Sequence, residues 1–315
     1  MKFCFILALS LICVAGYAQT SFTTDPDKLA YNVSDVVSFW AAYDQLANAK
    51  THADSVRIMD EAYLQKGTRG FKLYQKLSSS TPEQFVDVVR KHPKLLRSIR
   101  ASSLSIPQYR KAVVAGARKL KQLYPDAKFP ELFFCMGKFE VSGSREGDVL
   151  YIGAELNSLT DESPKDELTN PYIRANAGTI DRLKAVCLHE TAHYQQKLTP
   201  KNHLEAALVE GGAEFVALHI TGKSTMQPVF DQMTPELEQA IKREFTAVME
   251  KPIDAKWFLA YGDPATNRPG MLGYVIGFRI CEAYYKQATD KAAAIRNIIS
   301  LENYREIYEK SGYGQ

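Results

Sequence analysis

Apolar residues recur at helical spacing through the first third of the chain, from Ser34 to about Tyr124. After Ser34, which can cap a helix, large side chains follow at intervals that place them on one face: Val36, Val37, Phe39, Trp40, Tyr43 and Leu46. A further helix is predicted from about Pro107 to Leu123. The region is therefore expected to be a series of helices, and it contains no group of residues that suggests catalysis.

Two helix starts in this region carry stronger signals than apolar spacing alone. Thr51 with Asp54 has the form of a capping box for a helix that ends near Gly67. Thr81-Pro82-Glu83-Gln84 combines an N-cap, a proline at the first helical position and a carboxamide at the third. Pro93 is expected to interrupt the helix that follows, because proline lacks the backbone N–H that a helix interior needs.

The pattern changes near Lys128, where strands are predicted. Phe129 to Phe139 is rich in aromatic residues, and Asp148 to Ala154 is a short apolar run. Between them, Val141 to Gly147 is small, polar and contains glycine, as expected of a loop. We therefore predict a hairpin of two strands joined by this loop.

The remainder of the chain returns to helical spacing after a polar, turn-rich stretch at 157–178. Helices are expected at about 179–197, 203–221, 235–249, 270–287 and 289–311. The pattern as a whole predicts an α+β protein that is mostly helical with a small sheet.

The first 18 residues have the form of an export signal. Lys2 precedes an apolar run from Phe3 to Ala15, and Gly16-Tyr17-Ala18 offers a cleavage site before Gln19. A lipoprotein signal is a poor alternative, because Cys13 follows Ile12 and not a small residue. No later apolar stretch is long enough to span a membrane. We expect a signal peptide at 1–18, a helical region at 19–125 packed on the core, and a catalytic domain at 126–315, exported to the periplasm or secreted.

The composition of the chain excludes some classes of partner but does not assign a function. The 315 residues are 45% hydrophobic and 24% charged, with a formal net charge of +3. This small charge argues against nucleic acid or an anionic membrane surface as a partner. Cys135, Cys187 and Cys281 remain after the signal, and we interpret them as buried small side chains, with one disulfide and one free thiol as the alternative.

His189-Glu190-Thr191-Ala192-His193 is the most specific motif in the chain. Residues four apart lie about 40° apart around a helix, so both imidazoles can face one metal ion. Glu190 lies on the flank of that face and can act as the general base that takes a proton from a zinc-bound water. The motif predicts a catalytic zinc site, and a silent match with a structural role is the alternative.

A catalytic zinc ion takes a third protein ligand, and Glu210 is the best candidate. It lies 17 residues after His193 on the next predicted helix. No histidine occupies position 199, which is Thr199, and His203 fits no arrangement that we can justify. Glu214, one turn after Glu210, can accept the outer N–H of a ligand histidine, although a solvated helix face is its alternative. The small residues Gly211, Gly212 and Ala213 are expected to let the two helices approach closely.

At these residues the chain resembles the gluzincin group of zincin metallopeptidases. The resemblance implies a zincin-like fold, Zn²⁺ bound by His189, His193 and Glu210, Glu190 as general base and Glu214 as the residue that orients a histidine. The group often has Asp where this chain has Glu214. More narrowly, the chain is similar to uncharacterised secreted bacterial proteins with a predicted zinc-dependent protease domain, related to gliding-motility-associated proteins. Stretches that carry this likeness include Leu150–Glu155, Leu188–Gln196, Leu208–Phe215 and Gly273–Phe278.

The resemblance also implies a substrate strand, and hydrolysis itself requires a hydrogen-bond donor for the oxyanion. In zincins the edge strand above the metal helix pairs with an extended substrate. Our candidate is the segment Val149, Leu150, Tyr151, Ile152, Gly153 and Ala154, with an ordinary core strand as the alternative. For the oxyanion, Tyr274 is the first candidate, since Gly273 and Gly277 could bring it close to the site; Tyr261 and Arg268 are weaker ones.

These observations lead to one main functional hypothesis, an exported zinc metallopeptidase that acts on a peptide or protein substrate. An exported protein that keeps the scaffold for binding or for cell-envelope assembly is the second hypothesis. The intact Glu190 argues against it, because a protein without catalysis does not need the base. A zinc hydrolase of a non-peptide amide would use the same residues.

Overall fold

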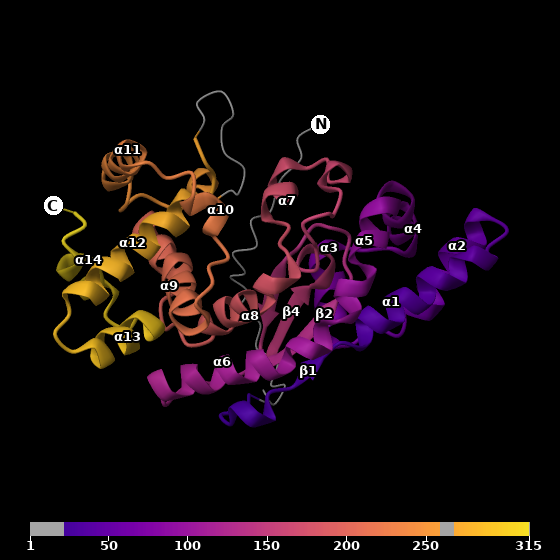
Figure 1. The fold of residues 1–315 in the computed structure, drawn as a ribbon, viewed down its shortest axis with the longest axis horizontal. Helices are drawn as coiled ribbons and strands as arrows, with labels where there is room; N and C mark the ends of the chain where they lie inside the picture. Colours follow the sequence, from indigo (N-terminus) through magenta and orange to yellow (C-terminus); the bar gives the residue numbers. More distant parts are fainter. Residues whose placement is uncertain (1–21, 259–267, 315) are drawn as a thin grey trace.

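The computed structural model describes residues 22–258 and 268–314. The predicted export signal at 1–18 lies outside the described residues. Figure 1 shows a small sheet at the centre of the molecule, with helices around it. The fold is mostly helical with one small sheet, so the predicted α+β class is confirmed.

The sheet has four strands in the order β1-β2-β4-β3. Their bounds are β1 (Tyr31–Asn32), β2 (Glu131–Cys135), β3 (Gly143–Glu146) and β4 (Val149–Gly153). Strand β2 runs parallel to both β1 and β4, and β3 runs antiparallel to β4. Strand β1, Tyr31–Asn32, is too short to show any alternation of apolar and polar residues. For this reason the sequence pattern did not predict it inside a region expected to be helical.

The predicted hairpin between Phe129–Phe139 and Asp148–Ala154 is wrong. The two predicted strands correspond to β2 and β4, and they are parallel neighbours. The chain reverses twice between them, because the segment predicted as a loop contains β3. A tight turn at Gly147 and Asp148, with Gly147 at φ 56°, joins β3 to β4. An edge strand with one neighbour needs no apolar alternation, so Gly143–Glu146 looked like a loop.

Strand β4 is also not the edge strand that the substrate prediction required. It lies between β2 and β3, and all of its residues, Val149 to Gly153, are buried. Ala154 follows in a buried 3-10 turn. Because the backbone of β4 pairs on both sides, it has no free edge for an extended peptide. The edge next to it is β3.

The helices have the following bounds: α1 (Ser34–Gln45), α2 (His52–Met59), α3 (Arg69–Ser78), α4 (Pro82–Lys91), α5 (Pro93–Leu104), α6 (Arg110–Leu123), α7 (Pro171–Asn176), α8 (Leu183–Ala192), α9 (His203–Thr221), α10 (Gln227–Phe230), α11 (Pro235–Thr246), α12 (Leu272–Gln287), α13 (Lys291–Ser300) and α14 (Tyr304–Ser311). Both predicted capping boxes, at Thr51 and at Thr81, are present. Pro93 begins α5, so the predicted interruption is confirmed.

Three helix predictions need correction. Helix α1 begins at Ser34, but its cap is not the Ser34 side chain; the Asn32 side chain accepts hydrogen bonds from the Ser34 N–H and hydroxyl. Helix α8 ends at Ala192, five residues before the predicted end at 197. The expected helix at 289–311 is two helices, because Leu301 adopts a left-handed conformation with φ 51° between them.

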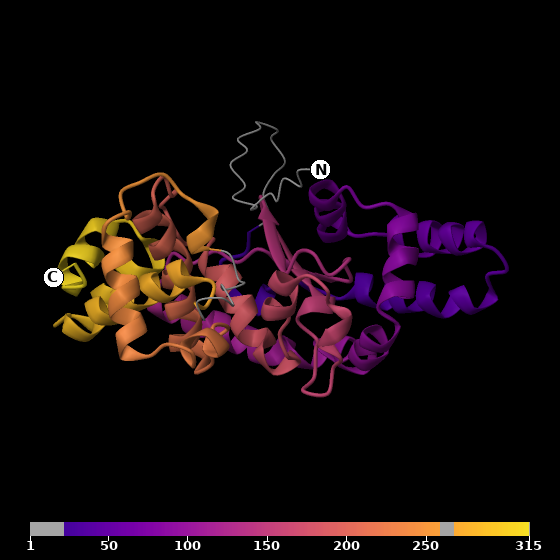
Figure 2. The same ribbon diagram turned by 90° about the horizontal axis from the view of Figure 1, so that it is seen from above.

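Figure 2 shows the helices α2 and α4 toward one end of the molecule and α11 to α14 at the other, with the sheet, α3 and α8 between them. Helix α1 packs on β2, and α3 packs on β2, β3 and β4. One continuous apolar core runs from Leu29 to Ile307 and includes both ends of the molecule. Cys135, Cys187 and Cys281 are buried and free, as interpreted from the sequence.

Helix α9 lies between α8 and the C-terminal helix α12 and packs on both. Helix α8 packs on α9 and on the sheet, and α9 makes its most extensive contact with α12. At Gly277 on α12, an added Cβ would lie 1.7 Å from the carbonyl oxygen of Ala207. The close approach expected from Gly211 and its neighbours therefore joins α9 to α12, and not α9 to α8. Within the described residues, none of the helices is both long enough and apolar enough to cross a membrane.

Candidate metal centre

The two histidines of the motif converge at the C-terminal end of α8. His189 lies in the last turn of the helix, and His193 is the capping residue that follows it, still with helical dihedral angles. Their Nε2 atoms lie 3.2 Å apart. Both side chains are nearly buried, so packing fixes their orientation.

Glu210 on α9 supplies an oxygen to the same point. Its Oε2 lies 3.6 Å from Nε2 of His189 and 3.5 Å from Nε2 of His193. A zinc ion bonded at about 2.0–2.1 Å sets its tetrahedral ligand atoms about 3.3–3.4 Å apart. The three observed separations match these values, so the residues fit a zinc ion. Among the described residues, these three form the group of metal-ligating side chains that could hold one ion.

The hydrogen bonds on the outer side of each ring fix its tautomer. Nδ1–H of His189 donates to Oε2 of Glu214 at 3.2 Å, and Nδ1–H of His193 donates to Oε1 of Gln196 at 2.8 Å. The Gln196 amide group donates its N–H to the carbonyl of Val209, which leaves its oxygen for the histidine. Nε2 of each ring therefore points inward, and a neutral ring with its proton on Nδ1 presents there the lone pair that metal ligation requires.

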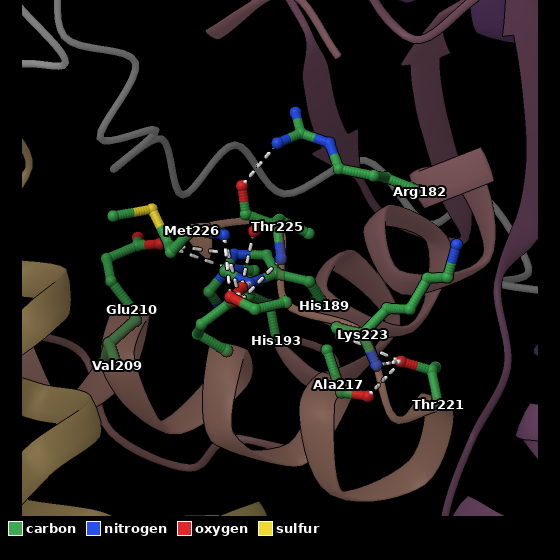
Figure 3. A network of polar contacts seen from close by, with 12 residues as sticks. Arg182, His189, His193, Val209, Glu210, Ala217, Thr221, Lys223, Thr225 and Met226 are labelled. Carbon is green, nitrogen blue, oxygen red and sulfur yellow. Dashed lines mark hydrogen bonds and ion pairs between the residues drawn. The ribbon is translucent and has the colours of Figure 1, made fainter. Parts of the chain in front are cut away.

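Glu214 is fully buried, and the loop after α9 surrounds its carboxylate with donors. Oε1 accepts from the Ser224 hydroxyl at 2.5 Å and from the Thr225 N–H at 2.7 Å. Oε2 accepts from the Thr225 hydroxyl at 2.5 Å in addition to His189. Arg182, whose guanidinium donates to the carbonyl of Thr225 at 2.9 Å, holds this loop in place. Figure 3 shows Thr225 and Met226 closing over the site beside His189 and Glu210.

The charges around His189 favour a cation at this point. Burial lowers the pKa of His189, but hydrogen bonds with Glu210 and Glu214 and the nearby charge of Glu190 outweigh it and raise the pKa to about 10. Burial raises the pKa of Glu210, and the adjacent imidazoles hold it well below its usual value. The side chains thus provide a negative, preorganised environment, in which a metal cation can supply the positive charge.

Glu190 lies between α8 and the edge strand β3. An added Cβ on Gly143 would lie 2.8 Å from Oε1 of Glu190, so the carboxylate packs against the bare backbone of β3. Its charge acts on both His189 and Tyr274. The carboxylate is therefore next to the three converging ligand atoms without being one of them.

Tyr274, in the first turn of α12, lies beside the ligand group. Its ring centroid is 6.4 Å from that of His189, with an interplanar angle of 13°. Burial raises the pKa of Tyr274 well above its usual value, and the negative charge of Glu210 adds to this effect. The phenol therefore keeps its proton and can act as a hydrogen-bond donor.

The other two candidates do not share this position in the described structure. Arg268 donates to Glu244 at 2.6 Å and lies over the ring of Trp257. Tyr261 lies outside the described residues. His203, for which the sequence offered no role, is held by the carbonyl of Val248 and the N–H of Asp254.

Several residues of the site carried no signal in the sequence. No motif pointed to Gln196, and Ser224 and Thr225 lie in a loop without a recognisable pattern. Tyr172 on α7 is close enough to Glu210 that this charge raises its pKa, after the larger effect of burial. Ser224 and Thr225 reach Glu214 from ten and eleven positions away, which no local pattern encodes. Gln196 is only three residues from His193, but the carbonyl of Val209 that orients its amide is 13 residues away.

Comparison with known proteins agrees with this geometry at a coarse level. Residues 154–302 match a protein family described as "Predicted Zn-dependent protease (DUF2268)". The matched part includes α8, α9 and α12, which carry the ligand group and Tyr274. No curated protein and no solved structure matches the chain. The match relates this part of the chain to a family that is predicted to consist of zinc-dependent proteases.

Proposed function

We propose that this protein is an exported zinc metallopeptidase of the gluzincin type. The convergence of two imidazole nitrogens and one carboxylate oxygen, at separations of 3.2, 3.5 and 3.6 Å, is the observation that carries the proposal. His189, His193 and Glu210 would hold the metal. Export rests on the sequence of residues 1–18 alone, and the destination is the periplasm or the medium.

The bound ion would supply Lewis-acid polarisation of the scissile carbonyl and a lowered pKa for the attacking water. Glu190 takes a proton from that water as its oxygen bonds to the carbonyl carbon. The same carboxylate then delivers the proton to the amine as the C–N bond breaks. The position of Glu190, beside the ligand group and against Gly143, supports this role.

Glu214 and Gln196 act through the histidines. By accepting the two Nδ1–H groups, they hold both rings in place with Nε2 directed at the metal position. Tyr274 donates its phenolic hydrogen bond to the oxygen on which negative charge develops. The raised pKa of the phenol supports this role, since the proton must be present at neutral pH.

The substrate is a peptide in extended conformation that pairs with β3. This strand replaces Val149–Ala154 in our proposal, because β3 pairs with β4 on one side and has no strand on its other side within the described residues. Gly143 at its start touches Glu190, so a paired peptide would pass next to the general base. Pairing of this kind supplies backbone hydrogen bonds and is independent of side chains.

The central test is Glu190→Gln in the mature protein. We expect zinc content near one ion per chain to persist, while hydrolysis of a peptide library falls by several orders of magnitude. His193→Ala should lose the zinc, and Tyr274→Phe should keep it but lower kcat about 100-fold. Undiminished hydrolysis by Glu190→Gln would refute the mechanism. Full zinc occupancy without any cleavage by the unaltered protein would favour a non-enzymatic role in binding or cell-envelope assembly.

A further inference from the structure

We propose that Arg145 on the edge strand β3 selects peptide substrates that carry an acidic side chain near the scissile bond. This inference rests on the proposed peptidase function and adds a substrate class to it. Three observations support it: the face of β3 on which Arg145 lies, its position relative to α8, and the pairing of its neighbours.

Alternation along β3 places Arg145 on the face that looks toward the metal helix. Side chains two residues apart in a strand point to the same side of the sheet. The Cβ direction of Gly143 leads to Glu190 on α8, so Arg145 shares the α8 face. Glu146, one residue further, forms an ion pair with Lys76 on α3 at 2.6 Å and so occupies the opposite face.

The surroundings of Arg145 agree with this placement. Burial raises the pKa of Tyr194, and the positive charge of Arg145 acts on it in the opposite direction, so the guanidinium is near this phenol. Tyr194 follows His193 directly in the chain, and its hydroxyl donates to the carbonyl of Val149. Arg145 thus lies at the end of α8 that carries the histidines.

The guanidinium is available to a ligand. Arg145 is exposed, and within residues 22–258 and 268–314 no hydrogen bond or ion pair engages its side chain. The carboxylates whose charge acts on the same phenol are those of Glu190 and Asp148. Asp148 is engaged by Arg69 at 3.1 Å, and Glu190 packs against Gly143. A planar guanidinium of this kind matches a carboxylate with two parallel hydrogen bonds.

The strand direction predicts where the acidic residue stands in the substrate. Strand β3 runs from Gly143, beside Glu190, toward Glu146. A peptide that pairs antiparallel to it has the residue opposite Arg145 two positions nearer its amino terminus than the residue opposite Gly143. Directly opposed residues present their side chains on the same face. We therefore expect the acidic side chain on the amino-terminal side of the cleaved bond.

The experiment compares matched fluorogenic peptides that differ by one Glu or Gln, placed in turn at each position on the amino-terminal side of the bond. For the unaltered zinc-loaded protein we expect kcat/KM about fivefold higher for the Glu peptide at the selected position, because an exposed ion pair has this magnitude. The preference should shrink at high salt. Arg145→Gln should abolish it, and Arg145→Glu should shift it toward a Lys peptide.

Lys76→Gln is the matched control. It removes a cation from the opposite side of the same strand, where Lys76 pairs with Glu146, and should leave the preference unchanged. Zinc content and thermal unfolding of each variant verify that the site and fold persist. Equal kcat/KM for Glu and Gln peptides at every position would overturn the selection by Arg145, while the peptidase function would stand.

A binding measurement separates the two proposals if no peptide is cleaved. The zinc-loaded Glu190→Gln variant is titrated with the same labelled peptides, with and without Arg145→Gln. Tighter binding of the Glu peptide that disappears with Arg145→Gln would support the selection even though the peptidase function had failed. Equal binding of both peptides would overturn the selection as well.

Discussion

Glu214→Gln tests how far the buried carboxylate controls the metal centre. The substitution keeps the size of the side chain and replaces one acceptor oxygen by an NH₂ group. In the native site, Oε1 accepts from Ser224 and from the N–H of Thr225, and Oε2 accepts from His189 and from the Thr225 hydroxyl. A glutamine oxygen can serve only one of these two sets.

With the amide oxygen at the Oε1 position, the NH₂ group faces Nδ1 of His189. The ring must then present a lone pair there and carry its proton on Nε2, the atom that points at the metal. Loss of such an outer hydrogen bond lowers metal affinity by about 10- to 100-fold. In the opposite orientation the NH₂ group faces the Thr225 N–H, so two donors meet without an acceptor. A buried donor without an acceptor lowers the free energy of unfolding by about 1–3 kcal/mol.

Zinc affinity is measured by competition with a chromophoric chelator at fixed pH. The free energy of unfolding is measured separately by urea titration of the metal-free protein, because bound metal would itself stabilise the fold. Glu205→Gln is the matched control, since Glu205 is also a buried glutamate of α9. Its carboxylate accepts from the Lys201 N–H and the Tyr304 hydroxyl, away from the ligand group.

We expect both variants to be less stable and only Glu214→Gln to bind zinc more weakly. A zinc affinity for Glu214→Gln within twofold of the unaltered protein, on the order of experimental error, would refute the tautomer argument. Equal losses of affinity in both variants would show that general loosening of α9, and not the hydrogen bond to His189, weakens the site.

Three further predictions concern packing and pH. Gly277→Ala should lower the free energy of unfolding, measured by urea titration, by about 1–3 kcal/mol or more, because the new Cβ would lie 1.7 Å from a backbone oxygen of α9. Gly212→Ala is the control: its Cβ would meet no neighbour nearer than 3.7 Å, so the substitution should be neutral or stabilising. Gly143→Ala should keep zinc and stability but lower kcat, because its Cβ would displace the Glu190 carboxylate; unchanged kcat would contradict that contact. Burial raises the pKa of Glu155 from 4.5 to about 7. The protonated side chain therefore stabilises the folded protein fully below pH 4.5, and this contribution, about 3 kcal/mol, is lost as the pH rises to about 7. Glu155→Gln should flatten the urea-derived stability profile across that range, and an unchanged slope would contradict the pKa assignment.

The sequence alone was sufficient where structure depends on residues a few positions apart. The capping boxes at Thr51 and Thr81 were readable because a cap and its partner are three residues apart. The four-residue spacing of His189 and His193 predicted one shared direction for the same reason. Helix α9 was predicted with the bounds it has, 203–221, and Glu210 with it.

Local patterns failed where partners are distant in the chain. The order of the sheet, the parallel pairing of β2 with β4 and the edge position of β3 depend on which strands meet. The glycine and three polar residues of β3 give no local indication of its partner. The same applies to Gln196, whose oxygen is directed at His193 by a carbonyl of α9.

The metal centre combines both kinds of information. Helical periodicity determined which side chains could share a direction within α8 and within α9. Only tertiary packing decided that the two helices bring those directions to one point, and that a glycine contact between α9 and α12 leaves Tyr274 beside His189. The physical reason is that helix geometry follows from hydrogen bonds within one turn, whereas the distance between helices follows from the complete set of side chains packed between them.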